Sequence, residues 1–169
     1  MGNRLLRLLK HRWFDERDTR RALRPAVLHR LRQRVADSER AHSGEIRVCV
    51  EAGLPLSYLW RGLTARDRAV TMFGKLRVWD TAHNNGVLIY LLLAEHAIEI
   101  VADRGLNAHV SPAQWAAIVA TMRQAFRIGR HEEALNTAID AVDALLRQHF
   151  PLASGEDNPN ELPDEPDLR

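Results

Sequence analysis

Apolar residues recur with a helical period in the first forty residues of the chain. Between residues 3 and 13, leucines and a tryptophan alternate with Arg, Lys and His, so an apolar stripe lies beside a basic face. A second helix is predicted to begin near Pro25, because proline is favoured in a first helical turn. Its expected inward face is Val27, Leu31 and Val35. The pattern predicts a basic amphipathic arm over residues 1–24, followed by a folded domain over residues 25–150.

The apolar period changes to two after residue 44. Ile46, Val48 and Val50 alternate with charged residues, which predicts a half-buried strand. Residues 87–93 are continuously apolar and are therefore expected to form a central strand covered on both faces. A tight connection leads to residues 98–103, so these two strands are predicted to form a hairpin.

Capping signals predict the helices that separate and follow the strands. Thr64 is followed three residues later by Asp67, and Ser111 by Gln114, which is typical of a capping box. A last helix is predicted from His131 to the residue before the proline at 151. The buried stripe expected for the helix after Thr64 is Ala69, Met72, Phe73, Leu76 and Trp79.

The charge of the chain is distributed unevenly along its length. The net charge is +2 over 169 residues, but residues 1–40 carry twelve Lys or Arg against five acids, and residues 151–169 carry one against six. The part between them has 11 of each sign, which argues against a nucleic-acid-binding core. Residues 151–169, rich in proline and acids, are predicted to be a disordered tail.

The basic arm has three interpretations, which the sequence leaves open. It can lie on an anionic membrane surface, bind a protein partner, or dock on its own domain. Residues 58–60 beside Arg61 form a further expected contact patch. The single Cys49 is expected in the core. No signal peptide or membrane-spanning stretch is recognised, so the expected location is cytoplasmic, with peripheral contact to the inner membrane as the variant.

Three stretches, in order and at matching spacing, resemble the TPM domain family, in its short cytoplasmic bacterial form. They are Ser38-Glu39 to Glu45-Ile46, Asn84-Asn85-Gly86-Val87-Leu88, and Ile98 to Leu106. His42-Ser43 stands where the family usually has threonine. The resemblance covers roughly residues 27–150 and implies an α/β fold: an α/β/α sandwich around a mixed sheet, with helices on both faces.

The resemblance implies several functions rather than one. Family members include accessory proteins and a thylakoid protein with acid phosphatase activity, and some members bind divalent cations, calcium included, at the edge of the sheet. Bacterial members are often encoded near LemA-type membrane proteins, which makes such a protein a candidate partner. The expected function is a non-catalytic interaction module acting at a protein or membrane surface, with calcium as its only expected cofactor. The alternative is an acid phosphatase-like, metal-assisted phosphomonoester hydrolase.

A cation site is predicted where the turn before the second strand approaches the loop after the third. Asp80, Asn84, Asn85 and Asp103 offer the hard oxygen ligands that calcium prefers. Glu51 and Asp67 are reserve ligands. An architectural interpretation stands beside this one, because Asn-Asn-Gly suits a left-handed turn and an aspartate suits a helix cap.

The phosphatase alternative would draw on Asp80, Asp103, Arg104 and His83. The sequence contains no Cys-x5-Arg loop, no glycine-rich phosphate loop and no His-Glu-x-x-His motif. Because no nucleophile can be matched with a base, no catalytic residue is assigned.

Overall fold

The computed structural model of the protein describes residues 2–153 and 155–169. Its helices are α1 (Gly2–Trp13), α2 (Glu16–Ala22), α3 (Pro25–Glu39), α4 (Leu56–Arg61), α5 (Ala65–Lys75), α6 (Arg104–Asn107), α7 (Pro112–Arg127) and α8 (His131–His149), with a 3-10 turn at Leu93–Glu95. Its strands are β1 (Ile46–Glu51), β2 (Val87–Leu92), β3 (Ala97–Ala102) and β4 (Asp167–Leu168). The short helices α2, α4 and α6 were not predicted from the sequence.

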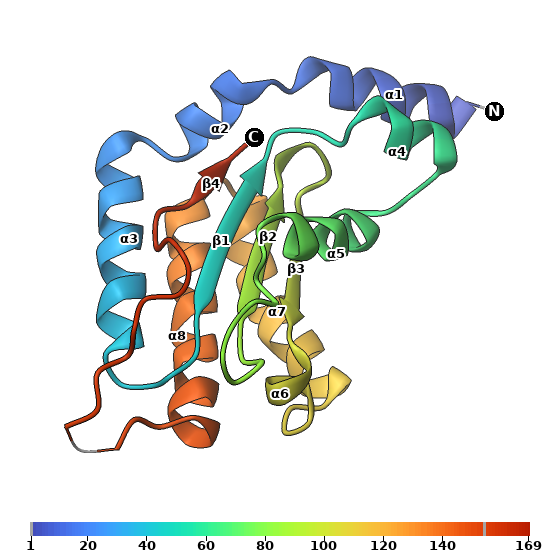
Figure 1. Ribbon diagram of the computed structural model, residues 1–169. Coiled ribbons are helices and arrows are strands. Elements are labelled where there is room, and N and C mark those ends of the chain that lie inside the picture. The colour runs from blue at the N-terminus through green and yellow to red at the C-terminus, as the bar shows by residue number, and fades with distance from the viewer. Residues whose placement is uncertain (1, 154) are drawn as a thin grey trace.

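The strands form one mixed sheet in the order β3-β2-β1-β4. β1 and β2 are parallel, with Ile46 opposite Val87, whereas β2 and β3 form the predicted antiparallel hairpin. β4 adds two residues to the outer edge of β1, parallel to it. The sheet thus has a hairpin at one edge and the end of the chain at the other (Figure 1).

Helices cover both faces of the sheet, so the predicted α/β sandwich is confirmed (Figure 1). On one face α3, α7 and α8 pack over a core that includes Val48, Ile89 and Ile100. On the other face α4 and α5 cover a smaller core around Leu88 and Tyr90. β2 is buried along its whole length, as its continuous apolar pattern predicts.

The predicted helix starts are confirmed by their hydrogen bonds. Thr64 accepts from the Asp67 backbone N–H at 3.2 Å and begins α5, and Ser111 makes the equivalent capping box at α7. The prediction of Trp79 as a buried residue is wrong, since its side chain is 50% exposed. α5 ends at Lys75, before the left-handed Arg77 (φ 56°), so Trp79 lies outside the helical stripe.

β1 was predicted to be half-buried, but every residue in it is buried. Its charged residues are satisfied inside the protein. Arg68 donates two hydrogen bonds to the Glu51 carboxylate at 2.8 and 2.6 Å, and the Tyr90 hydroxyl donates a third at 2.7 Å. Arg47 donates to carbonyl oxygens of the C-terminal tail. The alternation of apolar and charged residues in β1 therefore belongs to a strand that is covered by protein on both faces, and not to one with a solvent-exposed face.

The C-terminal tail departs from the disorder predicted for residues 151–169. Residues 156–169 run along the edge of the sheet between α3 and β1 and end as β4 (Figure 1). Leu162 is only 7% exposed, and Pro166 is buried. The prediction weighed the charge and proline content of the segment and overlooked that a few apolar residues can hold an acidic extended chain on a sheet edge.

Candidate functional site

The Asn-rich turn and the end of the hairpin lie against each other, as the sequence suggested. Arg104 Nε donates to Asn84 Oδ1 at 3.1 Å, and the Gly105 N–H donates to the Asn84 carbonyl at 2.9 Å. A Cβ at position 105 would lie 2.5 Å from that carbonyl oxygen, so only glycine fits this contact. Asn84 has a left-handed backbone (φ 53°), which suits asparagine.

The four predicted cation ligands are not equally placed. Asp80 forms an ion pair with Arg77. Asp103 caps α6 through Oδ1, which accepts from the Arg104 N–H at 2.7 Å, and the fully buried Asn85 donates from Nδ2 to Ser43 Oγ at 3.2 Å. Asn85 Oδ1 and Asp103 Oδ2 are buried and have no hydrogen-bond partner. Two of the four residues thus retain an unsatisfied acceptor oxygen.

The reserve ligands are occupied elsewhere. Glu51 is held by Arg68 and Tyr90, and Asp67 completes the capping box of α5. Within residues 2–153 and 155–169, no three His, Cys, Asp or Glu side chains are grouped so that they could hold a metal ion. A cation at the loop edge would therefore draw on the Asp103 carboxylate, on amide and backbone oxygens and on water.

The pocket beside the Asn-rich turn has the wrong charge for a phosphate. It has a volume of about 540 Å³ and includes Ser43, His83 and His149. Glu156, Asp157 and Glu161 also line it, and its described lining contains no Lys or Arg. A phosphomonoester dianion would meet three carboxylates there and no cationic clamp.

A Ser, His and Asp cluster between α3 and α8 was not anticipated from the sequence. Ser38 Oγ donates to Asp143 Oδ1 at 2.8 Å and lies 3.0 Å from His42 Nε2. In a nucleophilic triad the acid binds Nδ1 and the serine lies at Nε2, whereas here both groups lie on the Nε2 side and Nδ1 has no partner. Burial lowers the pKa of His42. The cluster joins two helices rather than activating a serine.

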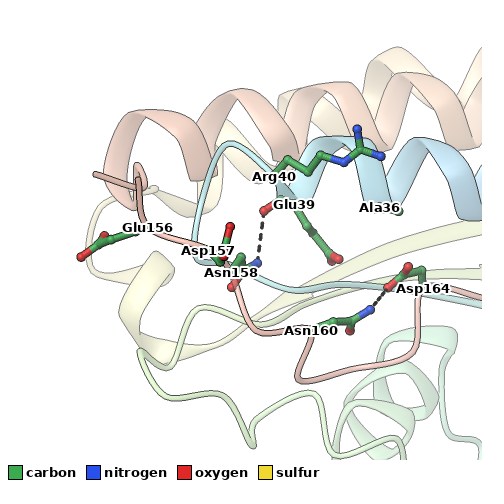
Figure 2. A pocket seen from close by; sticks show the side chains of 8 residues that line it. All are labelled: Ala36, Glu39, Arg40, Glu156, Asp157, Asn158, Asn160 and Asp164. Atoms are coloured by element: carbon green, nitrogen blue, oxygen red, sulfur yellow. Dashed lines mark hydrogen bonds between the residues drawn. The ribbon is translucent and has the colours of Figure 1, made fainter. Parts of the chain in front are cut away.

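Two buried carboxylic acids lie under the C-terminal tail. Glu39 accepts from the Ile46 N–H at 2.8 Å, and Glu45 Oε2 accepts from the Leu162 N–H at 3.1 Å. Burial, together with the charge of Glu45, raises the pKa of Glu39 to about 9, and burial raises the pKa of Glu45 to about 7. Figure 2 shows Glu39 beside a pocket of about 380 Å³ that separates α3 from the tail.

The N-terminal helix α1 docks on the domain through polar contacts. Arg7 Nε donates to Glu95 Oε1 at 2.6 Å, and the nearly buried His11 places Nε2 2.8 Å from the same oxygen. His11 Nδ1 accepts from the Leu54 N–H at 2.9 Å, so in this tautomer Nε2 carries the proton and donates to Glu95. Hydrogen bonds from His11 and Arg7 lower the pKa of Glu95 to about 2. We refer to Arg7, His11 and Glu95 as the arm latch.

The opposite side of α1 is apolar and open to solvent. α1 contacts α4, and together they expose six large apolar side chains. These are Leu5, Leu6, Leu9 and Trp13 on α1, and Leu56 and Trp60 on α4; we call them the α1–α4 face. Trp13 is 85% exposed and Trp60 is 77% exposed. The contact patch predicted around Trp60 is thus accessible, and the exposed Lys10, Arg12 and Arg61 lie on the same two helices.

The sequence indicated the apolar and basic composition of this face, but it did not indicate which residues fix α1 to the domain. Glu95 lies in the connection between β2 and β3, far along the chain from Arg7, and no local pattern links them. Leu56 was also missed, because the short helix α4 has too few residues to show a helical period. No helix in the described chain is long and apolar enough to cross a bilayer.

Comparisons with known proteins place the chain among a recognised group. A family model described as a TPM domain matches residues 17–145, which leaves α1 outside the matched segment. The NMR structure of the BA42 protein from the psychrophilic bacterium Bizionia argentinensis is similar, with a TM-score of 0.74 and 28% sequence identity. That similarity covers 86% of this chain and 94% of the other. No curated protein matched the chain.

Proposed function

This chain belongs to the TPM domain family, and from that premise we propose that it is a non-catalytic module that binds an anionic membrane surface through the α1–α4 face. The observation that carries the proposal is the exposure of six large apolar side chains on two contacting helices that also carry exposed basic residues. Large apolar patches on a monomer generally mark an interaction site.

A membrane fits this face better than a purely apolar partner would. Interfacial helices bury an apolar side among the acyl chains and keep Lys and Arg near anionic headgroups. Burying a large apolar side chain contributes about 1.5–3 kcal/mol, and each basic residue near an anionic surface about 1 kcal/mol. The arm latch supports this orientation, because it holds Arg7 and His11 against the domain while Leu5, Leu6 and Leu9 stay exposed.

Vesicle sedimentation tests the proposal. The protein should sediment with vesicles that contain phosphatidylglycerol and much less with phosphatidylcholine vesicles. Leu6→Glu and Trp60→Glu should each reduce binding at least tenfold, since each places a carboxylate where an acyl chain would lie. Ile128→Glu is the matched control, because Ile128 is similarly exposed (62%) at the end of α7.

Unchanged binding in both face variants would overturn the proposal. If wild-type protein binds no vesicle but retains a detergent-solubilised membrane protein, such as a LemA-type protein, and both substitutions abolish that retention, the face serves a protein partner instead.

Calcium binding at the loop edge is a second proposal, supported by the unsatisfied oxygens of Asn85 and Asp103. A ligand that binds only the native state raises the melting temperature. Millimolar calcium should therefore raise it in the wild-type protein and not in Asp103→Ala. Asp80→Ala should retain the shift, because Asp80 is paired with Arg77. The absence of any wild-type shift would leave the turn with an architectural role.

The phosphatase alternative receives less support from the geometry, since the pocket beside His83 is lined by carboxylates. Turnover of p-nitrophenyl phosphate at acidic pH that vanishes in both Asp80→Ala and Asp103→Ala would favour it over the membrane module. Inactivity with magnesium, manganese and calcium would dismiss it.

A further inference from the structure

The edge of β1 holds the C-terminal tail in a groove that recognises an extended backbone. The Arg169 N–H donates to the Val50 carbonyl at 2.9 Å, and the Ala52 N–H donates to the Arg169 carbonyl at 2.8 Å. Farther along, Glu45 accepts from the Leu162 N–H, and Arg47 donates to the carbonyls of Pro163 and Glu165. We call this edge, formed by residues 45–52 and the C-terminal turn of α3, the β1 groove.

Three apolar residues anchor the tail, and its acids point largely outward. Leu162 packs in the core under α5, Pro166 is buried, and Leu168 packs partly against the core on the other face. Most of the acidic residues between and before these anchors are exposed. The β1 groove therefore holds an extended segment with the spacing Leu-x3-Pro-x-Leu, an arrangement in which backbone hydrogen bonds are combined with buried side chains, as in strand addition.

The floor of the groove differs from a permanently packed core. Glu39, Glu45 and Arg47 are all more than nine-tenths buried there, and Arg47 Nε has no hydrogen-bond partner. An open pocket of about 380 Å³ separates the tail from α3, with Glu39, Asp157 and Asp164 on its walls (Figure 2). This unfilled space leaves the side chains on both walls without packing partners along this stretch.

The pairing of the tail with the sheet is also short. β4 contributes only two residues, opposite Cys49 and Val50, whereas β1 and β2 pair over six. A brief connection follows the end of α8 before Asn158 Nδ2 donates to the Glu39 carbonyl at 3.2 Å. A weakly paired terminal strand on a short connection is the kind of element that identical chains exchange.

We propose that the β1 groove is a peptide-binding site that accepts the C-terminal segment of a second copy of this chain in place of its own. The occupant is argued from complementarity: the segment seated in the groove supplies the required three anchors, and every copy carries it. When a tail leaves, β1 becomes an unprotected edge strand, which the tail of a neighbouring copy then covers. Two copies that exchange tails form a closed dimer.

A labelled peptide tests the site on the full-length chain. The receiver is the Leu162→Ala/Leu168→Ala variant, whose own tail is weakened while the groove is intact, and the probe is a fluorescein-labelled peptide of residues 156–169. Fluorescence anisotropy should show saturable binding to the receiver and at least tenfold weaker binding to the wild-type chain, in which the tethered tail competes. A peptide carrying the same two alanines should not bind. A peptide with Glu165→Ala, which alters an exposed side chain outside the pocket and keeps the backbone carbonyl that Arg47 binds, is the matched control.

The result that overturns the site is a folded receiver that does not bind the peptide, or that binds a scrambled peptide of the same composition equally well. Hydrogen exchange on the wild-type chain gives an independent check if the receiver loses its fold. The amides of Ala52 and Leu162 should exchange at least tenfold faster than those of Ile89 and Leu91 in β2. Equal rates would show that the tail does not open and would overturn the proposal.

Light scattering of the wild-type chain at increasing concentration tests the occupant. A dimer that forms slowly, and that is absent in the Leu162→Ala/Leu168→Ala variant, supports tail exchange. A chain that stays monomeric at millimolar concentration, even though the receiver binds the peptide, would overturn the second copy as the occupant.

Discussion

The two ends of the chain are both amphipathic, but they present opposite sides to the domain. The N-terminal helix α1 docks through the arm latch and leaves most of its leucines and Trp13 in solvent. The C-terminal tail turns Leu162 and Pro166 inward and leaves most of its acids in solvent. Composition alone therefore did not reveal what each end binds. In each end, one side makes contacts within the protein, and the opposite, exposed side is the one available to a partner.

Opposite net charge does not join the two ends directly. In the described part of the chain, no ion pair links residues 5–24 with residues 155–169, although α2 contacts β4. Arg20 and Arg21 lie near acids of their own helix, and Arg169 pairs with Asp167. The exposed Lys10 and Arg12 of α1 are thus available to an external anionic surface.

Removal of the arm latch should have the largest effect on stability among the single substitutions that separate the two ends. Glu95→Ala deletes the acceptor of both Arg7 and His11 and leaves Nε2 of the buried His11 ring without its partner. Hydrogen bonds to charged groups contribute about 1.5–3 kcal/mol each, so we expect a loss of about 2 kcal/mol, or roughly 4–8 °C in melting temperature. Thermal unfolding followed by circular dichroism measures it.

The matched control is Glu99→Ala. Glu99 lies on β3, and its carboxylate lies 3.7 Å from the half-exposed Arg66. A melting temperature that falls equally in both variants would mean that the latch does not hold α1. Faster exchange of the Leu54 amide in Glu95→Ala alone would locate the loss at the His11 contact.

The two ends should respond to pH in opposite directions. Glu95 has a pKa of about 2 in the folded chain, below its ordinary value of 4.5, because His11 and Arg7 bond to its charged form. The stability that it contributes is complete above pH 4.5 and is lost as the pH falls toward 2. Acid should therefore loosen the arm.

The tail should instead loosen as the pH rises. Burial raises the pKa of Glu45 to about 7, with added repulsion from Glu161 and Asp164, and raises the pKa of Glu39 to about 9, with added repulsion from Glu45 and Asp164. Their protonated forms favour the folded state, so stability declines as the pH rises from 4.5 through 7 and 9. Between pH 5 and pH 8 we expect a loss of a few kcal/mol that the two acids share, so Glu45→Gln and Glu39→Gln should each remove part of it. A wild-type melting temperature that is flat over this range would contradict the assignment.

The smallest expected effects are those of removing single basic side chains from the helices of the α1–α4 face. Lys10→Ala and Arg12→Ala should each weaken binding to anionic vesicles by about 1 kcal/mol, roughly fivefold, and leave the melting temperature unchanged. Both side chains are exposed and neither belongs to the arm latch. The loss should shrink at high salt, since screening removes the same attraction. A loss that is independent of salt would indicate a packing role instead.

The parts of the fold that follow from neighbouring residues were predictable from the sequence. The capping boxes at Thr64 and Ser111, the buried β2 and the hairpin all depend on contacts within a few residues or on a continuous apolar run. The burial of Arg47 was not predictable in this way, because its partners Pro163 and Glu165 lie more than a hundred residues further along. Long-range polar pairing leaves no local period.

The candidate sites also combine features that depend on neighbouring residues with features that depend on long-range contacts. The approach of Asn84 to Arg104 follows from the hairpin, whereas the ion pair of Asp80 with Arg77 was not anticipated. The apolar residues of α1 were visible in the sequence. Their outward direction depends on Glu95, which only the folded chain brings to Arg7.

Quenching of tryptophan fluorescence by brominated lipid tests the central claim most directly, because the four tryptophans report from different places. Trp13 and Trp60 lie on the α1–α4 face, Trp79 follows α5, and Trp115 lies on α7. In anionic vesicles with brominated acyl chains, the wild-type signal should fall strongly. Most of the quenching should disappear in Trp13→Phe/Trp60→Phe and persist in Trp79→Phe/Trp115→Phe. Quenching that persists in the first double variant, or that disappears in the second, would contradict membrane insertion through this face.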